Sequence, residues 1–173
     1  MRQYLELLKH VFNAGVEKND RQGVGNFCVA GYQMRFDLSL GVFPLITTRK
    51  LALKPIVAEL LWFLSGSSHV KDLHKHGVHF WDPWAKEEMC LPYGRELGDV
   101  GPIYGPQWRA WKKRDGGKID QIATLVANLK SDPYSRRHMV TTWNPEDIPN
   151  LWLAPCHGIF HCIVIGDRLN LHL

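Results

Sequence analysis

The sequence lacks the features that define several classes of protein. Its hydrophobic runs are short, and the longest, residues 55–64, is interrupted by Glu59, so none has transmembrane length. No block of lysine and arginine is present and the formal net charge is only +4, which argues against a basic nucleic-acid-binding tail. No internal repeat, linker or low-complexity tract occurs, which excludes a repeat array.

Cysteine is also scarce, and the spacing of the four cysteines fits neither a disulfide framework nor a zinc finger. No secretory-signal pattern follows Met1, so we expect reduced thiols and a cytoplasmic location. A zinc site remains a weaker alternative, because its ligands would come from separate stretches of the chain. These ligands would be Cys156, His157, His161 and Cys162, with His74, His76 and His79 as further candidates.

What the chain does have is enough hydrophobic sequence for one domain with a real core. Of its 173 residues, 45% are hydrophobic, 22% are charged and seven are tryptophan. Periodicity predicts helices over residues 1–17, 54–65 and 120–129, with a short helix within 69–79. Alternation predicts a strand or hairpin over 27–36 and strands over 138–143, 159–165 and 168–173, and glycine and proline predict a loop over 98–111. This order predicts a single α+β domain over residues 1–173.

The final residues form an alternating pattern that stops abruptly. Leu169, Leu171 and Leu173 lie on one face of the predicted last strand. Exposed strand edges are normally protected in native proteins. We therefore expect either a sheet edge or a domain that is incomplete at its C-terminus, and we favour the second.

Cys156 is the first candidate for chemistry. A nucleophilic cysteine needs nearby positive charge or a base to supply thiolate character. His157 is adjacent in sequence, but neighbours on a strand point to opposite faces, so adjacency does not make a catalytic pair. The residues alone leave three interpretations open: a buried hydrophobe, a metal ligand or a nucleophile.

Charged residues in unusual places are the second set of candidates. Arg136 and Arg137 are consecutive and could bind a phosphate through bidentate donors, as could Arg21 in a glycine-flanked loop. Solvated arginines in turns are the alternative. Glu59 lies in a helix that is apolar nearly all round, so its carboxylate must be paired or must face a cavity. A functional site and a structural ion pair both satisfy that requirement.

Aromatic residues concentrate in two predicted loops, residues 79–85 and 101–111. Such side chains can stack on a flat heterocycle, or they can pack in the core. They are Trp81, Trp84, Tyr104, Trp108 and Trp111.

Eight segments, taken in order, resemble the thymidylate synthase family over essentially the whole chain. They are NDRQGVG, FPLITTRKL, ELLWFLSG, FWDPWA, LGDVGPIYGPQWRAW, IDQI, DPYSRRHMVTTWNP and LAPCHGIF. The resemblance implies an α+β fold whose sheet face forms a homodimer. It also implies reductive methylation of dUMP at C5, with 5,10-methylenetetrahydrofolate as co-substrate and no metal.

The resemblance also implies a role for each candidate residue. Cys156 would add to C6 of the pyrimidine, and Glu59 would organise water and proton transfer near the C4 oxygen and the folate. Tyr104 and His157 would lie beside the nucleophile, and Trp81 and Trp84 would line the folate side of the site. Phosphate would be bound by Arg21 and by Arg136 and Arg137, the last two reaching across from the other subunit.

The sequence departs from the family pattern at several places. Ala52 stands where many members have a histidine that helps to bind folate, and Gln22 replaces a threonine. The family's Tyr-Gln-Arg-Ser block and its base-reading asparagine are not present. We therefore expect little or no turnover by this chain alone. A related hydroxymethyltransferase acting on dCMP, and a non-catalytic fragment, remain the alternatives.

Overall fold

The computed structural model describes residues 1–20 and 23–173, so the predicted phosphate ligand Arg21 lies outside the described residues. The chain divides into two compact units, residues 1–52 and 53–173, and each is described by itself. Among the described residues, no helix has both the length and the apolar character needed to cross a membrane. The mixture of helices and small antiparallel sheets confirms the predicted α+β class.

The first unit contains one helix and a short hairpin. Helix α1 (Arg2–Ala14) confirms the predicted first helix and ends at Gly15. Strands β1 (Val16–Lys18) and β2 (Asn26–Cys28) pair in antiparallel register. The strand predicted over residues 27–36 is wrong beyond Cys28, because the backbone turns at Gly31, whose φ of 71° is incompatible with an extended strand.

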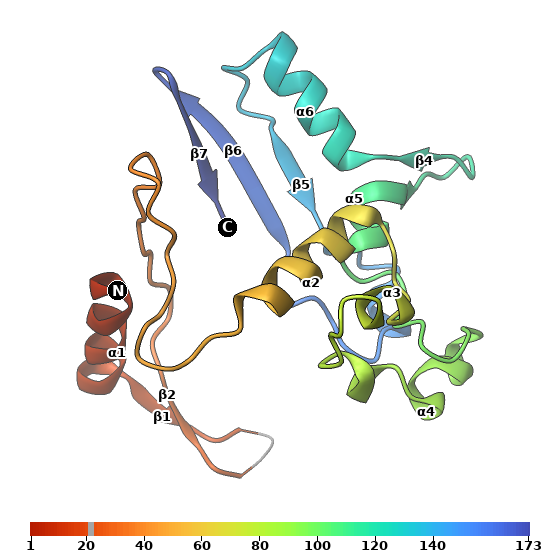
Figure 1. Ribbon diagram of the computed structural model, residues 1–173, viewed down its shortest axis with the longest axis horizontal. Helices are drawn as coiled ribbons and strands as arrows, with labels where there is room; N and C mark the ends of the chain where they lie inside the picture. Colours follow the sequence, from red (N-terminus) through yellow and green to blue (C-terminus); the bar gives the residue numbers. More distant parts are fainter. Residues whose placement is uncertain (21–22) are drawn as a thin grey trace. The chain divides into compact units, whose positions relative to one another are not determined.

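The second unit is built on the packing of two helices that lie side by side in Figure 1. Helix α2 (Leu53–Ser65) confirms the helix predicted over residues 54–65, and α5 (Gly105–Ala110) lies against it. The expectation from the sequence that this helix is buried is wrong in this unit, since only Ala58, Trp62 and Phe63 are buried and the other apolar side chains are partly or largely exposed. A Cβ atom on Gly105 would lie 2.7 Å from the Ser67 carbonyl oxygen, so only glycine allows this approach. The loop prediction over residues 98–111 is therefore wrong in its second half. Pro106 sits in the first turn of α5, where its missing N–H costs nothing.

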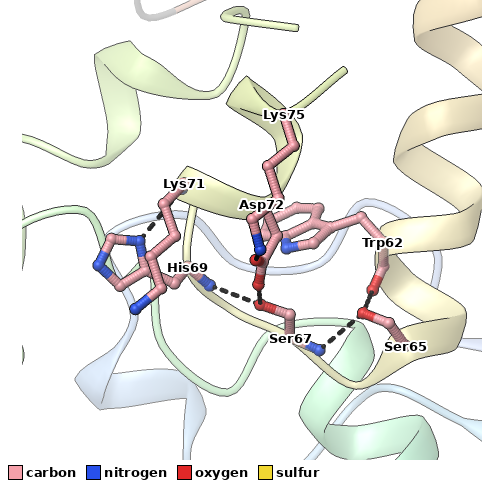
Figure 2. Close-up of polar contacts among 7 residues, drawn as sticks. All are labelled: Trp62, Ser65, Ser67, His69, Lys71, Asp72 and Lys75. Carbon is pink, nitrogen blue, oxygen red and sulfur yellow. Dashed lines mark hydrogen bonds and ion pairs between the residues drawn. The ribbon is translucent and has the colours of Figure 1, made fainter. Parts of the chain in front are cut away.

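Hydrogen bonds of two serine hydroxyl groups order the loop between α2 and α3 (Lys71–His74), as Figure 2 shows. The Ser65 hydroxyl donates to the Trp62 carbonyl at 2.7 Å, and the Ser67 amide donates to Ser65 Oγ at 3.3 Å. The Ser67 hydroxyl in turn donates to the Asp72 carboxylate at 2.6 Å. The Ser65 hydroxyl thus supplies a donor to a carbonyl at the end of α2, where backbone donors run out, and Ser67 ties the connecting loop to Asp72 in the first turn of α3. The short helix predicted within 69–79 is confirmed.

Short elements follow α3 along the chain. They are the 3-10 turns Asp82–Trp84, Leu91–Tyr93 and Ile148–Asn150, helix α4 (Glu87–Cys90), and the paired strands β3 (Trp111–Lys112) and β4 (Lys118–Ile119). Helix α6 (Gln121–Ser131) then confirms the helix predicted over residues 120–129. Asp120 caps it, accepting the Ala123 N–H at 2.9 Å.

A three-stranded antiparallel sheet closes the second unit, with α6 beside β5 in Figure 1. Its strands are β5 (Met139–Thr141), β6 (Ile159–Ile165) and β7 (Arg168–His172), which confirms the three predicted strands. Val140 and Cys162 are buried on the face that packs on the core. The alternating leucines Leu169 and Leu171 of β7 are exposed.

Candidate active site

The four cysteines separate into two buried and two exposed thiols. Cys90 and Cys162 are buried, and burial raises the pKa of the Cys162 thiol, which makes it inert. Cys28 and Cys156 are exposed. Accessibility therefore leaves two candidates for a nucleophile, and their surroundings must distinguish them.

Cys156 has an exposed side chain on an anchored backbone. Its N–H donates to the Tyr104 hydroxyl oxygen at 2.8 Å, and the Tyr104 side chain is only 4% exposed. Pro155, immediately before it, is buried, and residues 151–158 have no regular strand structure before β6 begins. The argument from opposite strand faces therefore does not apply to Cys156. A reactive atom is presented to solvent from a fixed frame, which is what a catalytic site requires.

His157 belongs to the aromatic wall beside Cys156. Its ring stacks on that of Tyr104, with centroids 4.5 Å apart and planes inclined by 28°. The ring also lies 6.5 Å from that of Trp108. Burial lowers the pKa of His157, so the imidazole is neutral at neutral pH. It therefore supplies a polar surface beside the cysteine rather than a fixed positive charge.

Tyr104 keeps its proton in this environment. Burial raises the pKa of its hydroxyl, and although the Cys156 N–H bond opposes this, the nearby thiol adds to the increase. The phenol oxygen thus accepts one hydrogen bond from the backbone and still carries its own O–H. That proton is available to a group that reacts at Cys156.

Glu59 is held by a tryptophan from a distant part of the chain. The Trp81 indole Nε1–H donates to Glu59 Oε1 at 2.6 Å. Half-burial raises the pKa of the Glu59 carboxyl, although this hydrogen bond acts in the opposite direction. The Trp81 ring packs edge-on against Tyr104, with centroids 6.4 Å apart. Side-chain contacts thus connect the half-buried carboxyl group, through Trp81 and Tyr104, to the backbone of Cys156.

The arginine pair occupies an exposed turn between α6 and β5. Arg136 and Arg137 are both exposed, and the buried His138 follows them directly. The His138 ring Nε2 lies 3.0 Å from the Asp132 carbonyl, so it donates across the turn and holds its two ends together. Arg137 also lines a cavity of about 180 Å³ with residues of α6 and β5, and Cys156 does not line it.

Two side-chain hydrogen bonds of this unit, made by His138 and Trp108, are not predicted by the sequence. The sequence predicts His138 only as the first residue of a strand, and nothing local indicates that its ring donates to the Asp132 carbonyl. Trp108 was considered for ligand stacking, yet its indole N–H donates to Thr142 Oγ1 at 2.9 Å inside the core. Nothing in the local sequence indicates that partner, because 34 residues separate the two.

The other tryptophans predicted for the site differ in how far they are exposed. Trp81 is buried, Trp84 is 37% exposed and Trp111 is half-buried. Within the described residues, the side chains named for the alternative zinc site around Cys156 do not form a group that could share one ion.

The fold and the site define an α+β protein with an accessible cysteine, a buried phenol and a protonatable carboxyl joined by aromatic contacts. The family model described as thymidylate synthase matches residues 2–173. The chain therefore belongs to the thymidylate synthase family, a family of methyltransferases of dTMP biosynthesis.

Proposed function

We propose that this chain acts in the reductive methylation of dUMP to dTMP, with Cys156 as the nucleophile. The co-substrate 5,10-methylenetetrahydrofolate supplies the carbon and the hydride, and this reaction itself uses no metal. The observation that carries the proposal is the accessible Cys156 thiol on a backbone fixed by the buried Tyr104 hydroxyl, in a chain matched to this family throughout.

The chemistry requires a reversible bond to the pyrimidine. The Cys156 thiolate adds to C6, and the electron pair of the C5–C6 double bond moves toward the C4 oxygen. C5 thereby becomes a carbon nucleophile that attacks the one-carbon unit. Loss of the C5 proton expels the tetrahydrofolate nitrogen from the transferred carbon and leaves an exocyclic methylene at C5. Hydride from the tetrahydrofolate then reduces this methylene to a methyl group as the thiolate leaves C6, which gives dTMP, dihydrofolate and the free cysteine.

Two groups with raised pKa values suit the charge that develops in this reaction. Burial raises the pKa of the Glu59 carboxyl group above its ordinary range, which makes it a better proton acceptor than an exposed glutamate, as general acid–base catalysis favours. The Tyr104 O–H, beside Cys156, can donate a hydrogen bond to a water molecule that takes the C5 proton, which orients that water at the reacting carbon. In this proposal His157 contributes a neutral polar contact, and Trp81 and Trp84 line the folate side.

Phosphate binding is assigned to arginines from two subunits of a homodimer in the cytoplasm. Arg21 would act within its own subunit, and Arg136 and Arg137 would enter the partner's site. The exposure of the pair, and a cavity at Arg137 that Cys156 does not line, support an assignment in which the pair serves another subunit.

The test follows hydrogen loss from C5 of the substrate. The 173-residue chain is incubated with dUMP tritiated at C5 and 5,10-methylenetetrahydrofolate, and tritium released to water is counted. Because the chain lacks the family's Tyr-Gln-Arg-Ser block, we expect a low rate of release, which Cys156→Ser abolishes and Cys28→Ser, a change at the other exposed cysteine, leaves unchanged. Release at background level, or equal release by Cys156→Ser, would contradict the proposal. The same assay with tritiated dCMP distinguishes the hydroxymethyltransferase alternative.

A further inference from the structure

A second cluster of reactive side chains lies on the surface of the second unit. His74 Nε2 is 2.7 Å from Asp82 Oδ1, and His79 Nδ1 is 3.1 Å from Asp82 Oδ2. The two imidazole rings stack, with centroids 4.5 Å apart and planes inclined by 25°. The three side chains are 39–62% exposed. Two imidazoles therefore direct ring nitrogens at the same carboxylate from one side.

The backbone that brings these residues together is fixed by the core. Gly77, with a φ of 68°, ends the helical turn, and its N–H donates to the His74 carbonyl at 2.9 Å. The Val78 N–H reaches back to the Leu73 carbonyl at 3.2 Å, which completes a Schellman motif. Leu73 and Val78 are 0% and 2% exposed. The turn that places His79 opposite His74 is thus anchored by two core side chains.

The ligand atoms are spaced as a transition-metal ion requires. One nitrogen from each histidine and one oxygen from Asp82 all lie within 4.8 Å of one another. A tetrahedral zinc ion with bonds of about 2.0–2.2 Å separates its ligand atoms by roughly 3.4 Å. The observed separations need only a small adjustment of exposed side chains to reach that value. Two imidazoles and one carboxylate are also a ligand set that zinc uses in proteins.

We propose that His74, His79 and Asp82 bind one Zn²⁺ ion, with its fourth position open to water. A hollow of about 240 Å³ adjoins His74 and Asp82, and His69 and Lys71 also line it. This space leaves room for the fourth ligand. The three ligands are different residues from those assigned to methyl transfer, although Asp82 directly follows Trp81 in the chain.

In the experiment, the metal-free 173-residue chain is titrated with Zn²⁺ alone, and isothermal titration calorimetry measures the binding. We expect one equivalent to bind, with affinity reduced at least about tenfold in His74→Ala, His79→Ala and Asp82→Asn. The matched control is His76→Ala, an exposed histidine of the same turn outside the cluster, which should bind like the parent chain. Circular dichroism checks that each variant is folded.

X-ray absorption of the zinc-loaded chain distinguishes this site from a site at the cysteines. We expect only nitrogen and oxygen neighbours near 2.0–2.1 Å, because the three proposed ligands contain no sulfur. A zinc–sulfur distance near 2.3 Å would overturn the proposal. Undetectable binding, or equal binding by folded His74→Ala and His79→Ala, would overturn it as well.

Discussion

At the scale of single residues, the site depends on one hydroxyl group with two functions. The Tyr104 oxygen accepts the Cys156 N–H, which fixes the backbone of the proposed nucleophile, and its ring stacks on that of His157. Burial keeps the phenol protonated, so the same group can also donate a hydrogen bond to a water molecule that takes the C5 proton. Removing the hydroxyl group therefore removes both functions while leaving the aromatic packing in place.

Tyr104→Phe tests this assignment. We expect tritium release from C5-labelled dUMP to fall about 10²-fold, the lower range for loss of a general acid–base group. Stability should decrease by only about 1 kcal/mol, the usual net value of one hydrogen bond. Tyr32→Phe, a change at an exposed tyrosine of the first unit, is the control. Unchanged release by Tyr104→Phe would show that the hydroxyl group has no catalytic part.

Glu59 makes a second prediction, on pH dependence. Its pKa is raised on folding, so the folded protein binds a proton more tightly there than the unfolded chain does. The resulting stabilisation is fully present below the ordinary carboxyl pKa and is lost as the pH rises through the raised value. Glu59→Gln removes this dependence and can still accept the Trp81 hydrogen bond through its amide oxygen.

Urea unfolding at pH 4 and pH 7 measures the effect. Relative to the parent chain, Glu59→Gln should be more stable at pH 7 than at pH 4. Glu88→Gln, at an exposed position, should show no such difference between the two pH values. If Glu59→Gln is instead less stable, relative to the parent chain, at pH 7 than at pH 4, the carboxyl pKa is lowered on folding rather than raised.

At the scale of elements, the close crossing of α2 and α5 holds the aromatic side chains of the site together. Phe63 of α2 lies with its ring 4.4 Å from that of Tyr104, which directly precedes α5. Glycine at position 105 makes this crossing possible, because its missing Cβ would overlap the Ser67 and Phe63 carbonyl oxygens. The order of the site therefore depends on a residue with no side chain.

Gly105→Ala should accordingly lower the free energy of unfolding by about 1–3 kcal/mol, the cost of overpacking a close contact. Gly158→Ala is the control, because a Cβ there would meet only the Trp143 Cβ at an ordinary 3.6 Å. Urea denaturation of both variants measures the difference. Equal free energies of unfolding for the two variants would show that the fold accommodates a Cβ atom at position 105 without loss of stability.

Elements with a clear hydrophobic period were predictable from the sequence, and those set by individual glycines were not. Helices α2 and α6 and the hairpin of β6 and β7 follow directly from periodicity and from the turn at Gly166. Helix α5 was missed because glycine and proline usually end helices, whereas here Gly105 permits packing and Pro106 starts the helix. The strand over residues 29–36 was overpredicted because alternation does not reveal the turn at Gly31.

At the scale of the whole molecule, the site is a set of residues far apart in sequence. Glu59, Trp81, Tyr104 and Cys156 are connected by contacts that span 22 to 52 positions. Residue types alone left Cys156 with three possible roles, because no local pattern specifies its tertiary partners. The family resemblance named the same residues, and the contacts through Trp81 and Tyr104 show how the fold connects them.

The proposed shared site can be tested with mixed dimers. If the arginine pair acts across the interface, co-expressing Cys156→Ser with Arg136→Ala/Arg137→Ala should restore one complete site in each mixed dimer. Random pairing then predicts tritium release of roughly a quarter of the parent value, although each variant alone is inactive. Release no greater than that of the separate variants would place the arginines in their own subunit's site.

The central claim is that Cys156 forms a bond to C6 of the pyrimidine, and trapping that bond is its most direct test. A dUMP analogue with fluorine at C5 cannot lose a proton there, so the thioether formed with 5,10-methylenetetrahydrofolate should persist. Peptide mapping by mass spectrometry then locates the adduct. The account predicts modification of the peptide containing Cys156 and none at Cys28, the other exposed cysteine. An adduct at Cys28, or none on the folded chain, would contradict it.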